Sequence, residues 1–335
     1  MDLTHSFATT LLSPMVLAFL LGIAARVVRS DLRLPEQLYS ALTIYLLFAI
    51  GLKGGAKLEG VSWAQFLPVA GAALLLCAAI PVWTFGLLRR FGGLSVEDAG
   101  AMAAHYGSVS AVTFGATLAF LETVHVTAEP FMPALLALME GPGILVALLL
   151  VQMSRSRFPQ GSLTQPASMG IVAGGTGTRL LTELLTSKGV VLLVGGLAIG
   201  LTCGKAGFEQ VAPLFDTPFK GVLTLFLLEL GLVTGGRLAD LRRVGPRLVL
   251  FGILMPLLHG FLGVWLGRHA GLGLGGATVL GSLAASASYI AAPAAVRLAL
   301  PEANPAYYLT SSLAVTFPFN IIVGIPVYFH FAQML

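Results

Sequence analysis

The chain has 335 residues, of which 56% are hydrophobic and 10% are charged, and its mean hydropathy is +0.90. Soluble domains carry about 25% charged residues, so this composition excludes a water-soluble globule and predicts an all-α polytopic membrane protein. The formal net charge of +4 comes from basic residues between apolar runs, which gives no support to nucleic-acid binding.

Ten apolar runs have the length and the lack of charge expected of transmembrane helices, which need about 20 residues to cross the bilayer core. The first run has no Lys or Arg before Arg26, so we expect a membrane span there rather than a cleaved signal peptide. The predicted spans lie near residues 11–28, 37–52, 64–88, 99–121, 131–153, 188–204, 217–235, 247–267, 274–299 and 307–332.

The basic residues are distributed unevenly between alternate loops. With the N-terminus outside, the inside loops hold 14 Lys and Arg residues and the outside loops hold 5. Because basic residues are retained in the cytoplasm, this asymmetry predicts that both termini are extracytoplasmic. The longest connection, 154–187, is rich in Ser, Gly and Pro and is predicted to be a flexible cytoplasmic linker.

The linker separates two halves of five spans, 1–153 and 188–335, that resemble each other. Gly51–Leu58 matches Gly231–Leu238, and Ser108–Ser110 matches Ser286–Ser288 at nearly the same offset along the chain. Because five spans is an odd number, the second copy must be inverted in the membrane. Inverted repeats are typical of secondary transporters, whose two halves exchange conformations during alternating access.

The fourth and ninth spans are the expected binding region, because such transporters hold their substrate at broken helices near the midplane. Both spans carry a Ser-x-Ser pattern, and Pro293 favours a break in the ninth. A stripe of small residues, Gly196, Gly200 and Gly204, predicts a helix contact on the sixth span, either within the chain or between subunits.

Glu140 lies deep in the fifth span, where a carboxylate is costly and indicates a cation ligand or a proton carrier. Glu229 could face a cavity or a subunit interface. His105 and His259 are either proton relays or buried histidines that serve packing, and the second interpretation is the simpler one. No Lys or Arg lies in the middle of a span, so an anionic substrate would need helix dipoles, hydroxyls and a co-bound cation.

Six short segments occur along nearly the whole chain: Ser13–Gly22, Ile50–Gly55, Gly107–Ser110, Pro256–Phe261, Ala284–Ser288 and Pro301–Pro305. In this order they resemble the sodium-dependent bicarbonate transporter family. The resemblance implies a Na⁺-dependent bicarbonate symporter, with ten helices in a 5+5 inverted repeat and broken fourth and ninth helices that cross. It also implies a core domain and a gate domain, a bacterial plasma-membrane location, a homotrimer in the lipid bilayer, and a PII-like cytoplasmic regulator.

The residues that the resemblance assigns to substrate or ion binding are Gly107, Ser108, Ser110, Thr113, Glu140, Ser286, Ser288 and Tyr289. Na⁺ is the implied coupling ion, held near Glu140, Ser110 and Ser288, and no other cofactor is expected. The chain departs from the family pattern at Tyr289, where an acidic residue is expected, and at Ala291, where a hydroxyl is expected.

Two alternatives follow from the same residues. One keeps the transporter fold but carries another organic anion, coupled to Na⁺ or to H⁺. The other is an intramembrane enzyme that uses the buried histidines and glutamates, but the chain lacks a nucleophile–base motif and an H-E-x-x-H pattern. We therefore predict that the protein is not an enzyme.

Overall fold

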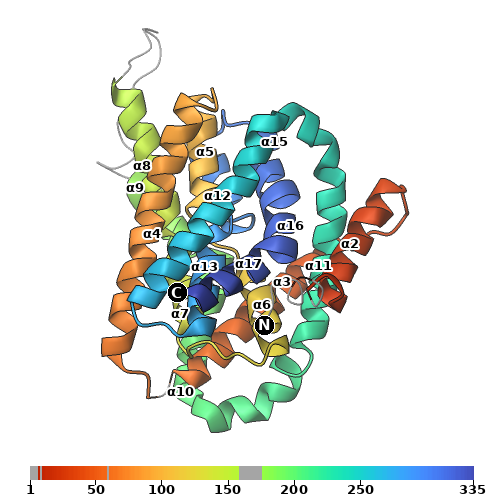
Figure 1. Ribbon diagram of the computed structural model, residues 1–335, viewed down its shortest axis with the longest axis vertical. Coiled ribbons are helices and arrows are strands. Elements are labelled where there is room, and N and C mark those ends of the chain that lie inside the picture. Colours follow the sequence, from red (N-terminus) through yellow and green to blue (C-terminus); the bar gives the residue numbers. More distant parts are fainter. Residues whose placement is uncertain (1–6, 8–9, 59, 158–175) are drawn as a thin grey trace.

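A computed structural model of the protein describes residues 7, 10–58, 60–157 and 176–335, and within them it contains helices and no strand. In Figure 1, α11 and α2 lie on the right of the view and α4, α8 and α9 on the left, with α12, α13 and α17 between them. The α-helices are α2 (Pro14–Val27), α3 (Glu36–Lys57), α4 (Trp63–Arg90), α5 (Val96–Tyr106), α6 (Ala111–Thr123), α7 (Met132–Met139), α8 (Pro142–Arg157), α9 (Thr176–Leu185), α10 (Lys188–Phe215), α11 (Phe219–Arg237), α12 (Leu241–His269), α13 (Leu274–Ala285), α14 (Ala291–Ala299), α15 (Pro305–Thr310), α16 (Phe317–Phe319) and α17 (Ile325–Met334).

Six helical stretches in the described residues are long and apolar enough to cross a membrane: Glu36–Lys57, Trp63–Arg90, Met132–Arg155, Lys188–Phe215, Phe219–His269 and Pro305–Met334. Two shorter apolar helices, α2 and α13, accompany them. The stretch Phe219–His269 contains both α11 and α12, which run in opposite directions in Figure 1 and are joined by the short 3₁₀ helix Leu238–Asp240. The protein is therefore a multi-pass, all-helical membrane protein.

Two of the predicted spans differ clearly from the helices observed. The sixth extends to Phe215 instead of residue 204, and its helix bends at Gly204, where φ is 61°. The fifth is interrupted after Met139, because Pro142 disfavours helical geometry in the preceding residue and α8 begins at that proline. Both described parts of the predicted linker are helical, in the last turn of α8 and in α9, while residues 158–175 lie outside the described residues.

Glycines allow two pairs of helices to pack at backbone contact. A Cβ atom at Gly231 of α11 would lie 2.1 Å from the carbonyl oxygen of Phe19 in α2, and one at Gly22 would lie 2.2 Å from that of Leu228. The glycine stripe of α10 packs in the same way against α3, where a Cβ at Gly200 would lie 2.1 Å from the oxygen of Leu52. Gly196 and Gly200 of this stripe therefore serve a contact within the chain, whereas Gly204 forms the bend of α10.

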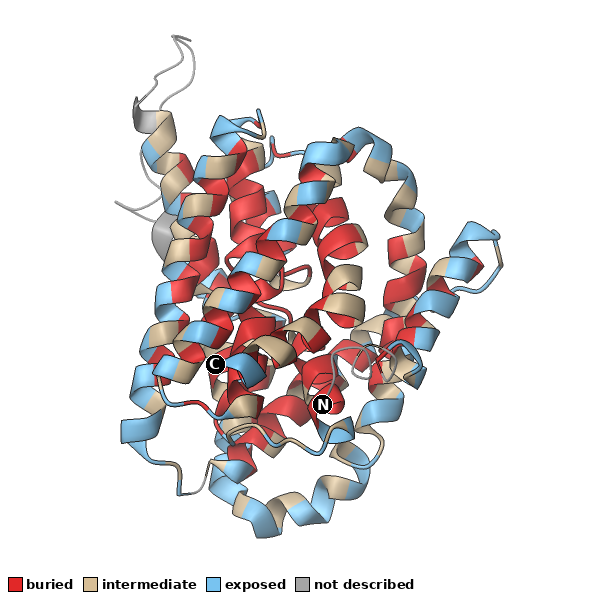
Figure 2. Cartoon of the chain, viewed as in Figure 1, coloured by how far each residue is buried: buried red, intermediate tan, exposed pale blue. Residues whose placement is uncertain are grey.

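The remaining helices form a second group with a more completely buried interior. Within it α4 packs against α5 and α8, and α12 packs against α13 and α17. We compare the most apolar part of two spans: 67% of its residues are buried in Pro305–Met334, and 22% of its residues are buried in α10. Figure 2 shows the same contrast, with buried residues in the central helices and exposed ones along the outer helices. We expect the exposed apolar faces to contact lipid.

The last span is irregular because proline interrupts its backbone hydrogen bonds. Pro318 has no N–H to donate to the preceding turn, and the helix passes through two π-helical segments, η2 (Ser311–Thr316) and η3 (Asn320–Gly324), on either side of α16. The wider π turns accompany two polar side chains, Thr316 and Asn320, that are fully buried against α12 and α13.

Candidate functional site

Two of the broken helices in the described chain have their breaks at the two Ser-x-Ser segments. The first break, 107–110, separates α5 from α6, and the second, 286–290, separates α13 from α14. Ser110 has extended backbone angles, and its hydroxyl accepts a hydrogen bond from the Thr113 N–H at 3.1 Å. The Ser288 hydroxyl similarly accepts from the Ala292 N–H at 3.2 Å. A serine hydroxyl thus satisfies one free N–H group of each second half-helix. Ser110 is the N-cap residue of α6, whereas Ser288 lies two residues before Ile290, the N-cap residue of α14.

The two breaks cross and are bonded to each other in both directions. The Ser110 N–H donates to the Ser286 hydroxyl at 3.0 Å, and the Ser288 N–H donates to the backbone oxygen of His105 at 2.8 Å. The Ser110 hydroxyl also donates to the Tyr289 hydroxyl at 3.2 Å. All these groups are buried away from water. The hydrogen bonds between the breaks therefore satisfy backbone groups that have no partner within a helix.

This crossing brings four helix ends to one place. The N-termini of α6 and α14 carry partial positive charge, and the C-termini of α5 and α13 carry partial negative charge. The first pair suits an anion, and carbonyls at the second pair suit a small cation such as Na⁺. The α13 end is partly used, because the Asn320 amide donates to the Ala285 oxygen at 2.9 Å.

Glu140 joins the crossing from the interruption between α7 and α8. Its backbone oxygen accepts a hydrogen bond from the Ser108 hydroxyl at 2.7 Å, and Gly143 packs on Gly107 so closely that a Cβ would lie 1.8 Å from the Gly107 oxygen. The Glu140 side chain is 8% exposed, and its Oε2 has no hydrogen-bond partner in the described residues. A buried carboxylate oxygen without a partner is costly and marks this group as a candidate ligand.

A small cavity of about 10 Å³ is lined by four polar residues, Ser110, Glu140, Ser288 and Tyr289, and by five apolar ones. We call it the polar cavity after the four polar residues. Its volume is about the space that one water molecule needs, so the protein is closed around these side chains in this conformation.

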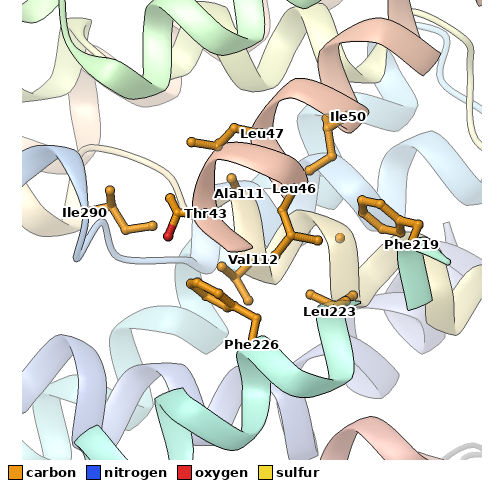
Figure 3. A pocket seen from close by; sticks show the side chains of 11 residues that line it. Thr43, Leu46, Leu47, Ile50, Ala111, Val112, Phe219, Leu223, Phe226 and Ile290 are labelled. Atoms are coloured by element: carbon orange, nitrogen blue, oxygen red, sulfur yellow. The ribbon is translucent and has the colours of Figure 1, made fainter. Parts of the chain in front are cut away.

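An apolar cavity of similar size lies next to it, between α3, α6 and α11, and shares Leu47, Ala111 and Ile290 with it (Figure 3). Thr43 is the single hydroxyl among its lining residues, and Phe219, Leu223 and Phe226 of α11 form one wall. The apolar cavity shares Ile50 and Phe219 with a third cavity, of about 550 Å³, at the end of the molecule where α3, α6, α7 and α11 meet. The three cavities therefore lie next to one another. The apolar cavity, which we call the apolar constriction, lies between the crossing and the large cavity, whose lining includes charged side chains.

The predicted site residues are not all in the cavity. Ser286 contributes through its bond to Ser110, and Ser108 through its bond to Glu140. Gly107 contacts Pro81 and Gly143, and Thr113 contributes its backbone N–H to the cap, so neither lines the cavity.

The two histidines that the sequence singles out, His105 and His259, have packing partners. His105 Nδ1 lies 2.7 Å from the Ala101 oxygen, and its ring lies on Tyr308 with the centroids 4.5 Å apart. His259 Nε2 accepts a hydrogen bond from Trp83 Nε1 at 2.8 Å, which ties α12 to α4. The two rings are fully buried in different helix contacts, as the packing interpretation predicts.

Two further residues support the broken ninth span. Asn320 bonds Ala285 and in turn accepts from the Tyr328 hydroxyl at 2.7 Å. Asn320 follows Glu140 at the offset that separates Gly51 from Gly231, so the repeat gives a signal for it. Glu129 Oε1 accepts from the Gly273 N–H at 2.6 Å and caps α13. No local pattern indicates that contact, because the two residues meet only through the fold.

A multi-pass protein whose two broken helices meet in a buried polar cluster has the architecture of a membrane transporter. Residues 14–333, nearly the whole chain, match the Na⁺-dependent bicarbonate transporter superfamily, and the protein belongs to that superfamily. This confirms the family that the sequence motifs indicated, and it points away from an enzyme. A comparison with curated proteins gives no match. The described residues contain no cluster of three His, Cys, Asp or Glu side chains suited to a metal ion.

Proposed function

We propose that the protein is a secondary active symporter that moves bicarbonate with Na⁺ by alternating access. The observation that carries this proposal is the crossing of two broken helices, bonded reciprocally through Ser110, Ser286 and Ser288. It presents two helix N-termini and a buried carboxylate at one point, which are the groups that a small anion and a Na⁺ ion require.

An inverted repeat of 1–153 and 188–335 about the linker 154–187 fits the helix contacts. Exchanging the two halves turns the α2–α11 pair into the α10–α3 pair, and both pairs pack closely. It likewise turns the contacts of α4 with α5 and α8 into those of α12 with α13 and α17. Gly51 and Gly231, which the repeat aligns, both mediate backbone contact with the partner helix. If each interrupted helix is counted as a single span, these contacts support ten spans. The two glycine-packed pairs, α2 with α11 and α3 with α10, fit a gate domain beside a core domain.

The bound Na⁺ is assigned to oxygen ligands around Glu140, Ser110 and Ser288. Glu140 Oε2 is buried without a partner among the described residues and lines the same cavity as the two serines, so the donor chemistry fits a hard cation. Tyr289 offers a hydroxyl where a carboxylate would add negative charge, so Glu140 is the single carboxylate that lines the polar cavity. Na⁺ and bicarbonate together are neutral, which limits the charge that the protein itself must supply.

The same carboxylate could carry a proton instead of binding Na⁺, and this keeps H⁺ coupling or another organic anion as the second candidate. A buried glutamate such as Glu140, whose Oε2 has no hydrogen-bond partner among the described residues, fits a proton-carrying site in a transporter. The two candidates differ in which gradient drives uptake and in which anion competes.

Uptake of labelled bicarbonate into proteoliposomes tests the proposal. We expect accumulation with an inward Na⁺ gradient and little uptake with an inward K⁺ gradient at the same pH and ionic strength. Accumulation with an inward H⁺ gradient and no Na⁺ would favour the second candidate. If neither gradient drives bicarbonate uptake by protein that is monodisperse in detergent, the proposed substrate is wrong.

The excess of basic residues in alternate loops supports a plasma-membrane orientation with both termini outside. From the resemblance of the sequence motifs to this family we also propose a bacterial location, a homotrimer and a PII-like cytoplasmic partner. Size-exclusion chromatography with light scattering tests the trimer, and co-purification tests the regulator.

A further inference from the structure

The large cavity, which we call the vestibule, carries charged side chains from several elements. It measures about 550 Å³ and lies where α3, α6, α7 and α11 meet. Its charged lining residues are Lys53, Lys57, Glu122, Glu129 and Lys220. The proposed topology places this mouth on the outside of the membrane. An anion that enters from this side meets these groups before it reaches the apolar constriction.

Both acids of the vestibule have a partner through one carboxylate oxygen, while Oε2 of Glu129 is buried without a partner among the described residues. Glu122 forms an ion pair with Lys220, with Oε2 and Nζ 3.0 Å apart, and Glu129 caps α13 through the Gly273 N–H. Lys53 forms an ion pair with Asp216 at the end of α10. Each of these charges therefore has a partner of opposite sign or a helix N-terminus.

Lys57 is the exception among the charged residues of the vestibule. Its side chain is exposed to the cavity and makes no ion pair with any described residue. It lies in the last turn of α3, a helix that also lines the apolar cavity and the crossing through Ile50 and Leu47. An ammonium group with three N–H donors and no protein acceptor is suited to a small oxyanion.

The repeat places a second basic residue at the corresponding position of the other half. Arg237, which the repeat aligns with Lys57, occupies the last turn of α11 and lines a cavity of about 380 Å³ with Arg26 and Arg33. Under the inverted repeat the two positions lie at opposite faces of the membrane. Arg237 forms an ion pair with Asp240, with Nη1 and Oδ2 3.6 Å apart, and Glu229 lines the same cavity. The repeat therefore relates the two basic residues by position, and of the two only Lys57 lacks an ion pair among the described residues.

We propose that Lys57 forms an outer capture site, where a monovalent oxyanion such as bicarbonate binds the ammonium group before the apolar constriction opens. This inference rests on the proposed function for its substrate. The site is open to water, so binding is weak and exchange is fast. It raises the local concentration of the anion above the constriction and so accelerates loading.

Three variants test this role in the same proteoliposome uptake assay. K57Q should raise the KM for bicarbonate about 5- to 10-fold while the maximal rate stays within about twofold, because the crossing itself is unchanged. K57R should stay close to wild type. K205Q removes the same charge from α10 at a residue that does not line the vestibule and should change nothing. A KM for K57Q equal to that of K205Q overturns the capture site.

A second measurement does not depend on transport. A membrane-impermeant amine reagent acetylates exposed lysines in the purified protein, and mass spectrometry gives the rate at each one. Bicarbonate, compared with chloride at equal ionic strength, should slow acetylation of Lys57 and leave that of Lys205 unchanged. Protection without any driven uptake would keep the capture site and refute the proposed function. Driven uptake without protection, and without a KM change in K57Q, would refute the capture site alone.

Discussion

Replacement of Ser110 by alanine tests the crossing most directly, because this hydroxyl takes part in two bonds at once. It accepts from the Thr113 N–H at 3.1 Å and donates to the Tyr289 hydroxyl at 3.2 Å. The substitution S110A leaves the Thr113 N–H without its cap and the tyrosine hydroxyl without its donor. Loss of an N-cap costs about 1 kcal/mol, and loss of a buried hydrogen bond costs a similar amount.

The effect on transport is larger than the effect on folding if the hydroxyl also contacts substrate or ion. Loss of one such contact costs about 1–3 kcal/mol, which corresponds to about a 5- to 150-fold rise in KM. We expect S110A to remain monodisperse in detergent and to show this rise in Na⁺-driven uptake of labelled bicarbonate. S288A should behave in the same way, because the Ser288 hydroxyl accepts from an N–H group in the first turn of α14, as the Ser110 hydroxyl does in α6.

Ser282 provides the matched control. It lies on α13, its side chain is fully buried, and its hydroxyl has no partner in the described residues. S282A therefore removes a buried hydroxyl without breaking a bond and should transport like the wild type. If S110A and S288A have the same KM and maximal rate as S282A, their hydroxyls serve packing only and the site lies elsewhere.

Three further predictions follow from other parts of the structure. E140Q keeps the shape of the side chain but removes its charge, so uptake should lose its response to the Na⁺ or H⁺ gradient. If E140Q uptake stays fully coupled to the gradient, backbone carbonyls and hydroxyls bind the cation instead of Glu140. G231A should reduce the yield of monodisperse protein and its thermal stability in detergent, because the new Cβ would lie 2.1 Å from the oxygen of Phe19, whereas G71A, with nothing within 4 Å, should be neutral. An epitope inserted within 158–175 should be reached by antibody only after cells are permeabilised, and labelling of intact cells would reverse the predicted orientation.

Family, fold class and the position of the crossing were predictable from the sequence, because each depends on local or repeated patterns. Charge-free runs locate membrane helices, since a charge in hydrocarbon is costly wherever it falls. The Ser-x-Ser segment that occurs once in each half indicated both breaks and so brought Ser110 and Ser288 into consideration. Glu140 was predictable for a similar reason, since a carboxylate inside a span needs a functional or structural explanation.

The tertiary structure alone decided the contacts between residues that lie far apart in the chain, because no local sequence pattern relates them. The sequence places Gly107 and Thr113 in the candidate site, and the structure shows that Gly107 packs against Pro81 and that the Thr113 N–H donates to the capping hydroxyl of Ser110. The cap of α13 by Glu129 and the series of cavities from the vestibule to the crossing depend on residues that are far apart in the chain. Hydropathy and helix propensity act over one or two turns of the chain. The pairing of charges depends instead on how the helices pack. Lys220 therefore has an ion-pair partner, whereas Lys57 has none among the described residues.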